Sequence, residues 1–263
     1  MKNQAVVFLA WGEKFIQEVE FCIRRSKALK GYDLILITDE NTDLINLRCT
    51  FAEVVKASFE TEGHLRKTEL IQFLPKTYDT YLFLDSDTVV IDDISLGFKK
   101  AERFGIAVSP APHYSLDYFW GFDRIMNLEG IECKGQLQYN TGVIFFKNSP
   151  TVKSIFIRWR ELALRYQKDF ISDQPFFSLA MEKLDFNPYT LSISYNYRGF
   201  GDAISGIVRI WHSHGELPAK INEFKKAWPL RRAWPSKVVF PDEVEHGSPI
   251  FRLLRKIKCL IRR

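Results

Sequence analysis

Cysteine is scarce in this sequence, and its spacing suggests no metal or redox centre. The four cysteines among the 263 residues are Cys22, Cys49, Cys133 and Cys259. Their separations fit neither a zinc site nor a redox pair, which excludes the common thiolate metal sites and thiol oxidoreductases. We therefore expect ordinary free thiols of a reducing compartment.

Long apolar runs and flexible linkers are also absent. The first apolar run, Ala5 to Trp11, is too short to cross a membrane, and no signal-peptide cleavage pattern follows it. No Gly-, Ser- or Pro-rich segment divides the chain, and no internal repeat is present. We therefore expect one cytoplasmic domain over residues 1–248, followed by a C-terminal helix over residues 249–263.

Short apolar runs alternate with segments of helical periodicity. The runs are typical of strands buried on both faces of a parallel sheet, and they lie at residues 5–9, 34–37, 81–84, 105–108, 143–146 and 207–211. Apolar residues at helical spacing predict helices over residues 15–29, 65–74, 150–166 and 172–184. The pattern indicates an α/β sandwich with a largely parallel sheet. Ligands of such sheets bind outside the carboxyl ends of the strands.

One long segment follows neither period. Residues 109–139 contain two prolines, His113, Trp120 and Gly121 and show no clear periodicity. An irregular segment of this length in a compact domain is usually functional. We therefore expect a long loop there that contributes to a ligand site.

Two carboxylates stand at the end of a predicted buried strand. Asp85-Ser86-Asp87 follows the apolar run at 81–84, and the pair is costly to keep there unless a cation lies between them. Mg²⁺ or Mn²⁺ would provide that charge, because both prefer oxygen ligands and complete their shells with substrate phosphates. The same triplet is also good turn chemistry, so a plain turn is the alternative.

Four motifs together resemble glycosyltransferase family 8. Residues 82–88 (LFLDSDT) are similar to the metal-binding signature of GT-A fold glycosyltransferases, and residues 139–143 (YNTGV) to their Asn-Ser/Thr-Gly turn. Residues 173–174 (DQ) resemble the pair that opens a helix in family 8, and residues 211–215 (WHSHG) its His-x-x-Gly element. The resemblance covers about residues 5–220. It implies a GT-A (Rossmann-like) three-layer α/β sandwich with a mostly parallel central sheet.

The resemblance implies a metal site built from Asp85, Asp87 and His212. In the family, Mn²⁺ or Mg²⁺ is held against the donor pyrophosphate and neutralises charge on the departing nucleoside diphosphate. A neutral imidazole suits Mn²⁺. His214 would share a strand face with His212 and is the competing ligand. Alternatively, His212 caps the strand end through a backbone hydrogen bond.

The resemblance also implies two catalytic residues, Asp173 and Gln174. It places Asp173 on the donor sugar hydroxyls and Gln174 near the anomeric carbon, where a polar group can support an oxocarbenium-like transition state. The alternative for Asp173 is a helix N-cap, which is a common role of Asp before a helix.

The implied donor-binding residues are spread along the chain. Ala10 leaves room for a uridine base, Thr38-Asp39 can contact ribose or uracil, and Lys67 faces the nucleotide unless it is a solvated helix lysine. The full set is Ala10, Thr38, Asp39, Lys67, Asp85, Ser86, Asn140, Gly142, Gly215 and Lys220. The family usually follows His-x-x-Gly with Lys-Pro-Trp, whereas residues 216–220 here read ELPAK. Lys220 is the candidate for the missing phosphate-binding lysine, and the retaining stereochemistry depends on that assignment.

Residues 249–263 form a basic amphipathic pattern. The net charge of +5 is concentrated in this tail, where apolar residues fall on one helical face and six Arg and Lys residues on the other. Such a helix is typical of an anchor to an anionic membrane surface. The alternative is a terminal helix packed on the core. Nucleic acid is not expected as a partner, because the positive charge is confined to the tail.

These observations favour a metal-dependent glycosyltransferase. We expect it to move a sugar from a nucleotide-diphosphate sugar, UDP-linked by the resemblance, to a glycan or lipid-linked saccharide at the inner membrane face. The loop at 109–139 would shape the acceptor pocket. A nucleotidyltransferase is the alternative enzyme, although residues 10–14 (AWGEK) are a poor version of its Gly-rich basic loop. A non-catalytic sugar-nucleotide or membrane-binding module is the third option, and it would not need Asp85, Asp87 and His212.

Overall fold

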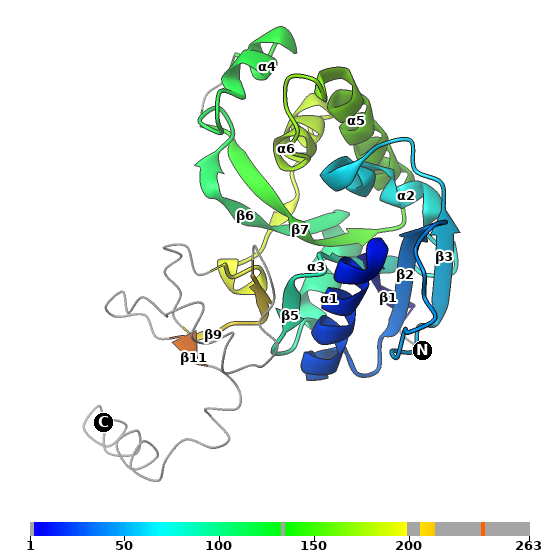
Figure 1. Cartoon of the computed structure of the whole chain (residues 1–263). Helices are drawn as coiled ribbons and strands as arrows, with labels where there is room; N and C mark the ends of the chain where they lie inside the picture. Colours follow the sequence, from blue (N-terminus) through cyan, green and yellow to red (C-terminus); the bar gives the residue numbers. More distant parts are fainter. Residues whose placement is uncertain (1–2, 133–134, 199–205, 214–237, 240–263) are drawn as a thin grey trace, which may run out of the picture.

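A seven-stranded sheet forms the centre of the molecule (Figure 1). The computed structural model describes residues 3–132, 135–198, 206–213 and 238–239. The strands, in sheet order, are β3 (Glu53–Ala57), β2 (Asp33–Asp39), β1 (Gln4–Leu9), β4 (Thr80–Leu84), β7 (Leu137–Lys147), β6 (Ile106–Ser115) and β8 (Tyr189–Thr190). The four strands from β3 to β4 are parallel, β7 is antiparallel to both β4 and β6, and β8 is parallel to β6. The expected α/β fold with a mostly parallel sheet is therefore confirmed.

Helices cover both faces of this sheet (Figure 1). On one face lie α1 (Gly12–Arg25) and α3 (Ser95–Phe104). The other face carries η2 (Gly63–Glu69), α2 (Leu70–Phe73), α5 (Pro150–Tyr166) and α6 (Gln174–Lys183). The remaining short helices are η1 (Lys27–Leu29), α4 (Asp123–Leu128) and η3 (Ile193–Tyr195). The result is the three-layer sandwich that the sequence predicts.

Alternate residues of each central strand pack into different cores. On β1, Val7 belongs to the core beneath α5 and α6, whereas Val6 and Phe8 belong to the core beneath α1. On β4, Phe83 and Leu82 are divided in the same way. Both faces of these strands exclude water, which is why their sequences are continuous apolar runs instead of alternating ones.

Two short two-stranded sheets lie outside the central one. β5 (Thr88–Val90) pairs antiparallel with β10 (Ile210–His212), and β9 (Gly206–Ile207) pairs parallel with β11 (Val238–Val239). The first of them follows β4 by only a three-residue turn. It therefore brings a distant part of the chain to the carboxyl edge of the central sheet.

The structure corrects several expectations about individual elements. The helix expected over 65–74 is divided between the 3-10 helix η2 and the short α-helix α2, and the Glu69 carboxylate at the end of η2 accepts hydrogen bonds from the backbone N–H groups of Glu60 and Thr61. The 109–139 loop is shorter than expected, since β6 extends to Ser115 and β7 starts at Leu137. The sequence did not predict this extension of β6, because a proline such as Pro110 argues against a strand. The pairing of β6 with β7 is irregular on both sides of Pro110. Strand β3 and helix α3 have no counterpart among the expected elements.

The predictions for the C-terminal part are not tested. The helix expected over residues 249–263 and the end of the expected domain at 248 lie outside the described residues. Within the described residues, no helix has both the length and the apolar character needed to cross a membrane. Cys22 and Cys49 are free thiols, as expected.

Replacing Gly97 tests how closely α3 packs on β7. A Cβ atom at Gly97 would lie 2.5 Å from the ring of Phe145, which is fully buried and contacts the rings of Phe98 and Tyr195. We expect Gly97→Ala to lose about 1–3 kcal/mol of unfolding free energy through overpacking, which outweighs a gain of about 1 kcal/mol from helix propensity. Urea unfolding measures this, with Lys99→Ala on the exposed face of α3 as the control. Equal or higher stability of Gly97→Ala would contradict the packing.

Candidate active site

The end of β4 and the first half of β7 meet at the carboxyl edge of the sheet. Leu84 pairs with Val143, and the Asp85 backbone N–H donates to the Gly142 carbonyl at 2.8 Å. Because β7 is antiparallel to β4, its early residues lie at the edge where the parallel strands end. The two motifs at 82–88 and 139–143 are therefore neighbours in space.

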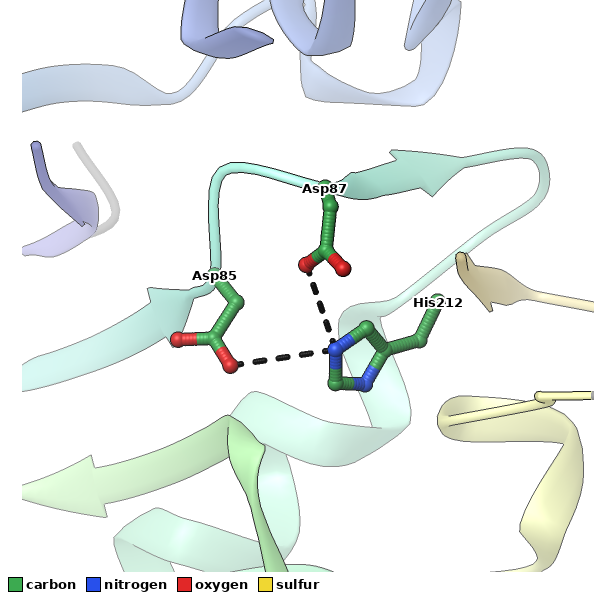
Figure 2. A group of neighbouring side chains, drawn as sticks. All are labelled: Asp85, Asp87 and His212. Carbon is green, nitrogen blue, oxygen red and sulfur yellow. Dashed lines mark ion pairs between the residues drawn. The ribbon is translucent and has the colours of Figure 1, made fainter. Parts of the chain in front are cut away.

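A third segment completes this edge. The β5–β10 pairing places His212 opposite Thr88, and the Ser213 N–H donates to the Asp87 carbonyl at 2.8 Å. His212 Nε2 lies 3.2 Å from Asp87 Oδ1 and 3.7 Å from Asp85 Oδ2 (Figure 2). Ligand atoms of the three residues all lie within 4.8 Å of one another. Two carboxylates and one imidazole in this arrangement form a donor set that suits Mn²⁺.

A series of hydrogen-bonded side-chain amides orients the imidazole of His212 from its Nδ1 side. His212 Nδ1 is 2.9 Å from Asn196 Oδ1, and Asn196 Nδ2 donates to Asn140 Oδ1 at 2.7 Å. Asn140 Nδ2 then donates to Gln174 Oε1 at 2.7 Å. Because an amide oxygen only accepts, His212 Nδ1 carries the proton and donates. In the neutral imidazole, the lone pair is then on Nε2, toward the two carboxylates.

Lys67 lies buried between two carboxylates. Its Nζ is 2.8 Å from Asp85 Oδ1 and 3.7 Å from Asp173 Oδ2, and it lies over the ring of Phe83. Burial alone would lower the pKa of Lys67, but the charges of Asp173 and Asp85 outweigh burial and raise it. The alternative of a solvated helix lysine is wrong, because the side chain is only 8% exposed.

Asp173 stands at the start of α6 but does not cap it with its side chain. No capping hydrogen bond is made, and the Asp173 Oδ2 accepts instead from Thr141 Oγ1 at 2.7 Å. Its backbone carbonyl accepts from Trp159 Nε1 at 2.8 Å, which fixes the helix start against α5. The carboxylate is therefore directed to the sheet edge beside Lys67.

The triplet Asn140-Thr141-Gly142 lies within β7, and so the expected turn is wrong. The side chains of Asn140 and Thr141 donate hydrogen bonds to Gln174 and Asp173 at the start of α6. A Cβ atom at Gly142 would contact His212 Cε1 and lie 2.7 Å from Asp85 Oδ2. Glycine is therefore required here by the close approach of the imidazole and the carboxylate, although its φ is ordinary.

These groups line one cleft of about 1130 Å³. This volume lies slightly above the usual range of small-molecule sites, about 300–1,000 Å³. The predicted site residues that line it are Lys67, Asp85, Ser86, Asp87, Asn140, Gly142, Asp173, Gln174 and His212.

Three predicted donor-binding residues do not line the cleft. Ala10 and Thr38 are fully buried, and Asp39 lies at the end of β2. Asp39 accepts from Thr42 Oγ1 at 2.6 Å and pairs with Arg66 at 2.9 Å. Burial would raise the pKa of Asp39, but the Thr42 hydrogen bond and the Arg66 charge lower it overall.

Three predicted residues lie outside the described part of the chain: Gly215, Lys220 and the alternative ligand His214.

Other residues in or behind the cleft were not among the sequence predictions. Glu18 of α1 accepts from Ser86 Oγ at 2.6 Å, and Asn196 holds His212 in place. Phe119 and Trp120 line the cleft from the β6–β7 connection. No local sequence pattern predicts the roles of Glu18 and Asn196, because each contacts a residue that is far away in the sequence. For Phe119 and Trp120, the only indication in the sequence was that they lie in the irregular segment expected to contribute to a ligand site.

Removing the charge of Lys67 tests the electrostatics of the cleft. We expect Lys67→Met to lose about 3–5 kcal/mol of unfolding free energy, because it leaves Asp85 and Asp173 without their shared cation. The raised pKa of Lys67 means that its stabilisation is complete below the ordinary pKa of 10.5 and is lost as the pH rises through the higher folded value.

Denaturant unfolding at several pH values checks both statements. The stability gap between wild type and Lys67→Met should stay constant near neutral pH and narrow in strongly alkaline buffer. The exposed Lys76→Met is the matched control and should lie close to wild type. A gap that widens with pH, or one no larger than that of the control, would contradict the assigned ion pairs.

Several solved structures share this architecture. Mouse xyloside xylosyltransferase 1, in its apo form, has a TM-score of 0.55 and 14% identity over 82% of this chain and 99% of its own. The galactosyltransferase LgtC, in complex with donor and acceptor sugar analogs, has a TM-score of 0.58 and 15% identity over 87% of this chain and 93% of its own. The apo form of GlyE from Streptococcus pneumoniae TIGR4 has a TM-score of 0.52 and 16% identity, over 81% of this chain and 54% of its own.

No family model matches the sequence, and no curated protein matches it. The likeness to these glycosyltransferase structures therefore rests on their shared architecture, at identities that establish the fold alone. This chain has the GT-A fold, and it resembles structures of the family 8 type.

Proposed function

We propose that this protein is a metal-dependent glycosyltransferase that uses a nucleotide-diphosphate sugar. The observation that carries the proposal is the convergence of Asp85, Asp87 and His212 within 4.8 Å, in the same cleft as Asp173 and Gln174. Such a cleft provides a place for a divalent cation beside polar groups suited to sugar hydroxyls. UDP is the expected nucleotide, and the enzyme would be of the hexosyltransferase type.

The donor set fits Mn²⁺ or Mg²⁺. The two carboxylates supply hard oxygen ligands, and His212 Nε2, whose ring is fixed by the Asn196 contact, supplies a nitrogen that favours Mn²⁺. When bound there, the ion would supply positive charge for the diphosphate of the donor and of the leaving nucleotide. The turn alternative for residues 85–87 is compatible with this role, since the Thr88 N–H donates to the Asp85 carbonyl at 3.3 Å.

Asp173 and Gln174 are proposed to act on the donor sugar. Asp173 is positioned by Thr141 and Lys67, and Gln174 by the amide of Asn140, so neither side chain is free to swing away from the cleft. The Asp173 carboxylate would accept from sugar hydroxyls. The Gln174 amide would lie near the anomeric carbon and support a retaining transfer.

The nucleoside is proposed to bind near the ends of β1 and β2. Ala10, whose side chain is only a methyl group, follows β1, and Thr38 and Asp39 end the neighbouring strand β2. The Asp39 carboxylate, kept ionised by its neighbours, would accept from ribose hydroxyls. Gly215 and Lys220 are proposed to close over the diphosphate, with Lys220 as its cationic partner.

The acceptor is proposed to be a hydroxyl of a glycan or a lipid-linked saccharide. The connection between β6 and β7, which is what remains of the expected 109–139 loop, would shape its pocket. The basic helix over residues 249–263 would hold the enzyme at the anionic inner face of the membrane and so bring it to a lipid-linked acceptor. The rest of the protein would face the cytoplasm.

Nucleotide binding tests the metal site. We expect calorimetry to show that Mn²⁺ strengthens UDP binding to the wild type, and that Asp87→Ala weakens binding in Mn²⁺ at least about tenfold, because it removes a ligand. Asp79→Ala is the matched control, since Asp79 is an exposed carboxylate at the opposite end of β4. Hydrolysis of a panel of UDP-sugars would then identify the donor, and the anomeric form of the product its stereochemistry.

Two outcomes of this experiment would count against the proposal. UDP binding that does not depend on Mn²⁺ and is unchanged in Asp87→Ala would contradict the metal site. The absence of any nucleotide binding by the wild type would contradict the glycosyltransferase itself.

Vesicle flotation tests the tail. We expect the full chain to float with phosphatidylglycerol-containing vesicles and deletion of residues 249–263 to abolish this, since each basic residue contributes about 1 kcal/mol at an anionic surface. Neutral phosphatidylcholine vesicles control for apolar insertion alone, and UDP binding by the shortened chain controls for folding. Undiminished flotation of the shortened chain would refute the anchor.

A further inference from the structure

Trp120 combines high exposure with a place in the cleft. Its side chain is 81% exposed, and it lines the same cleft as the two catalytic candidates Asp173 and Gln174. A single exposed apolar residue is normal on a protein surface and carries no functional meaning. Two further observations separate Trp120 from that ordinary case.

The first observation is the backbone of Trp120. Its φ is +50°, in the left-handed region that only Trp120 and Asp185 enter among the described residues other than glycine. The Trp120 N–H donates to the Tyr118 carbonyl at 2.9 Å, and Gly121 continues the turn with φ +81°. A bulky residue is strained in this region, and such strain is concentrated at functional sites. A glycine would form the same turn without the strain, but without an aromatic ring.

The second observation is the support behind the ring. The indole of Trp120 is nearly parallel to the ring of Phe119, at 11° and with centroids 5.8 Å apart. Phe119 contacts Phe170, which packs against the rings of the buried Phe122 and of Phe176. A series of aromatic contacts therefore connects the exposed indole to the core and limits its movement.

The position of Trp120 in the sheet order indicates that it contacts the acceptor and not the donor. It follows β6, whereas the proposed nucleoside site follows β1 and β2, and the sheet order places β4 and β7 between them. The metal ligands and the start of α6 lie at that middle position. A donor that extends from β2 to the metal therefore leaves the β6 side of the cleft for the second substrate.

We propose that Trp120 is the platform on which the acceptor sugar stacks. A pyranose has C–H groups on its faces and hydroxyls around its edge, so it fits an aromatic wall with polar groups nearby. Here Trp120 provides the wall, and Asn140 and Gln174 provide amides in the same cleft. The proposal rests on the glycosyltransferase function above and names the acceptor class as a pyranoside.

The experiment measures UDP release from the UDP-sugar that the wild type hydrolyses, with methyl α- and β-D-hexopyranosides and lactose, cellobiose and maltose as acceptors. Methyl glycosides are used because an aromatic aglycone could itself stack. We expect some of these acceptors to accelerate UDP release by the wild type. Trp120→Ala should raise the acceptor KM about tenfold, while the UDP affinity and the rate of donor hydrolysis in water stay unchanged.

Two variants serve as controls. Tyr118→Ala removes an aromatic ring that is 82% exposed on the same turn but lines a separate hollow of about 300 Å³, so its acceptor KM should match the wild type. Trp120→Phe keeps an aromatic face and should restore most of the acceptor affinity. A general disturbance of the turn would affect Tyr118→Ala as well, and would not be relieved by phenylalanine.

The failures of the two proposals are distinguishable. A wild type that neither binds UDP nor hydrolyses any UDP-sugar contradicts the proposed function. A wild type that turns over its donor, with Trp120→Ala showing an unchanged acceptor KM or a lowered UDP affinity, overturns the platform alone. Donor turnover that no pyranoside accelerates also overturns it.

Discussion

One buried cation holds the site together. Lys67 lies between Asp85 at the end of β4 and Asp173 at the start of α6, with Nζ distances of 2.8 and 3.7 Å. Without it, these carboxylates and that of Asp87 would repel one another at the sheet edge, where burial weakens the screening by water. The ion pairs of Lys67 therefore connect three separate elements, η2, β4 and α6. The placement of the Asp173 carboxylate, which is proposed to act on the donor sugar, depends on it.

Hydrogen-bond direction then links the two ends of the site. The oxygen of Gln174 accepts a hydrogen bond from the Asn140 amide nitrogen, and the oxygen of Asn140 accepts from that of Asn196. The oxygen of Asn196 in turn accepts from His212 Nδ1. Rotating one amide would place two acceptors or two donors against each other, which is costly where the groups are buried. The orientation of the imidazole is therefore coupled to that of Gln174, although the two residues come from different elements. This coupling keeps the candidate metal ligand and the candidate catalytic amide in fixed positions.

The sequence predicted the central elements because their signal is local. Strands buried on both faces are continuous apolar runs, and β1, β2, β4 and β7 all show one. The edge strand β3 was missed because it is largely exposed and has no such run. The antiparallel direction of β7 was missed for another reason. Direction is decided by how the chain crosses between strands, and apolar runs carry no information about it.

The sequence by itself determined that two carboxylates would follow a buried strand, because the apolar run ends at Leu84 and the acidic residues are adjacent to it. It also determined the α/β class, since alternating periods leave few other ways to bury both strand faces. Only the tertiary structure decided which distant groups join them. His212 arrives through the β5–β10 pairing, Asn196 supports it from another segment, and the Asp173 side chain turns toward Lys67 instead of capping α6. Each of these contacts joins residues far apart in the chain, where local periodicity has no influence and packing alone sets the distance.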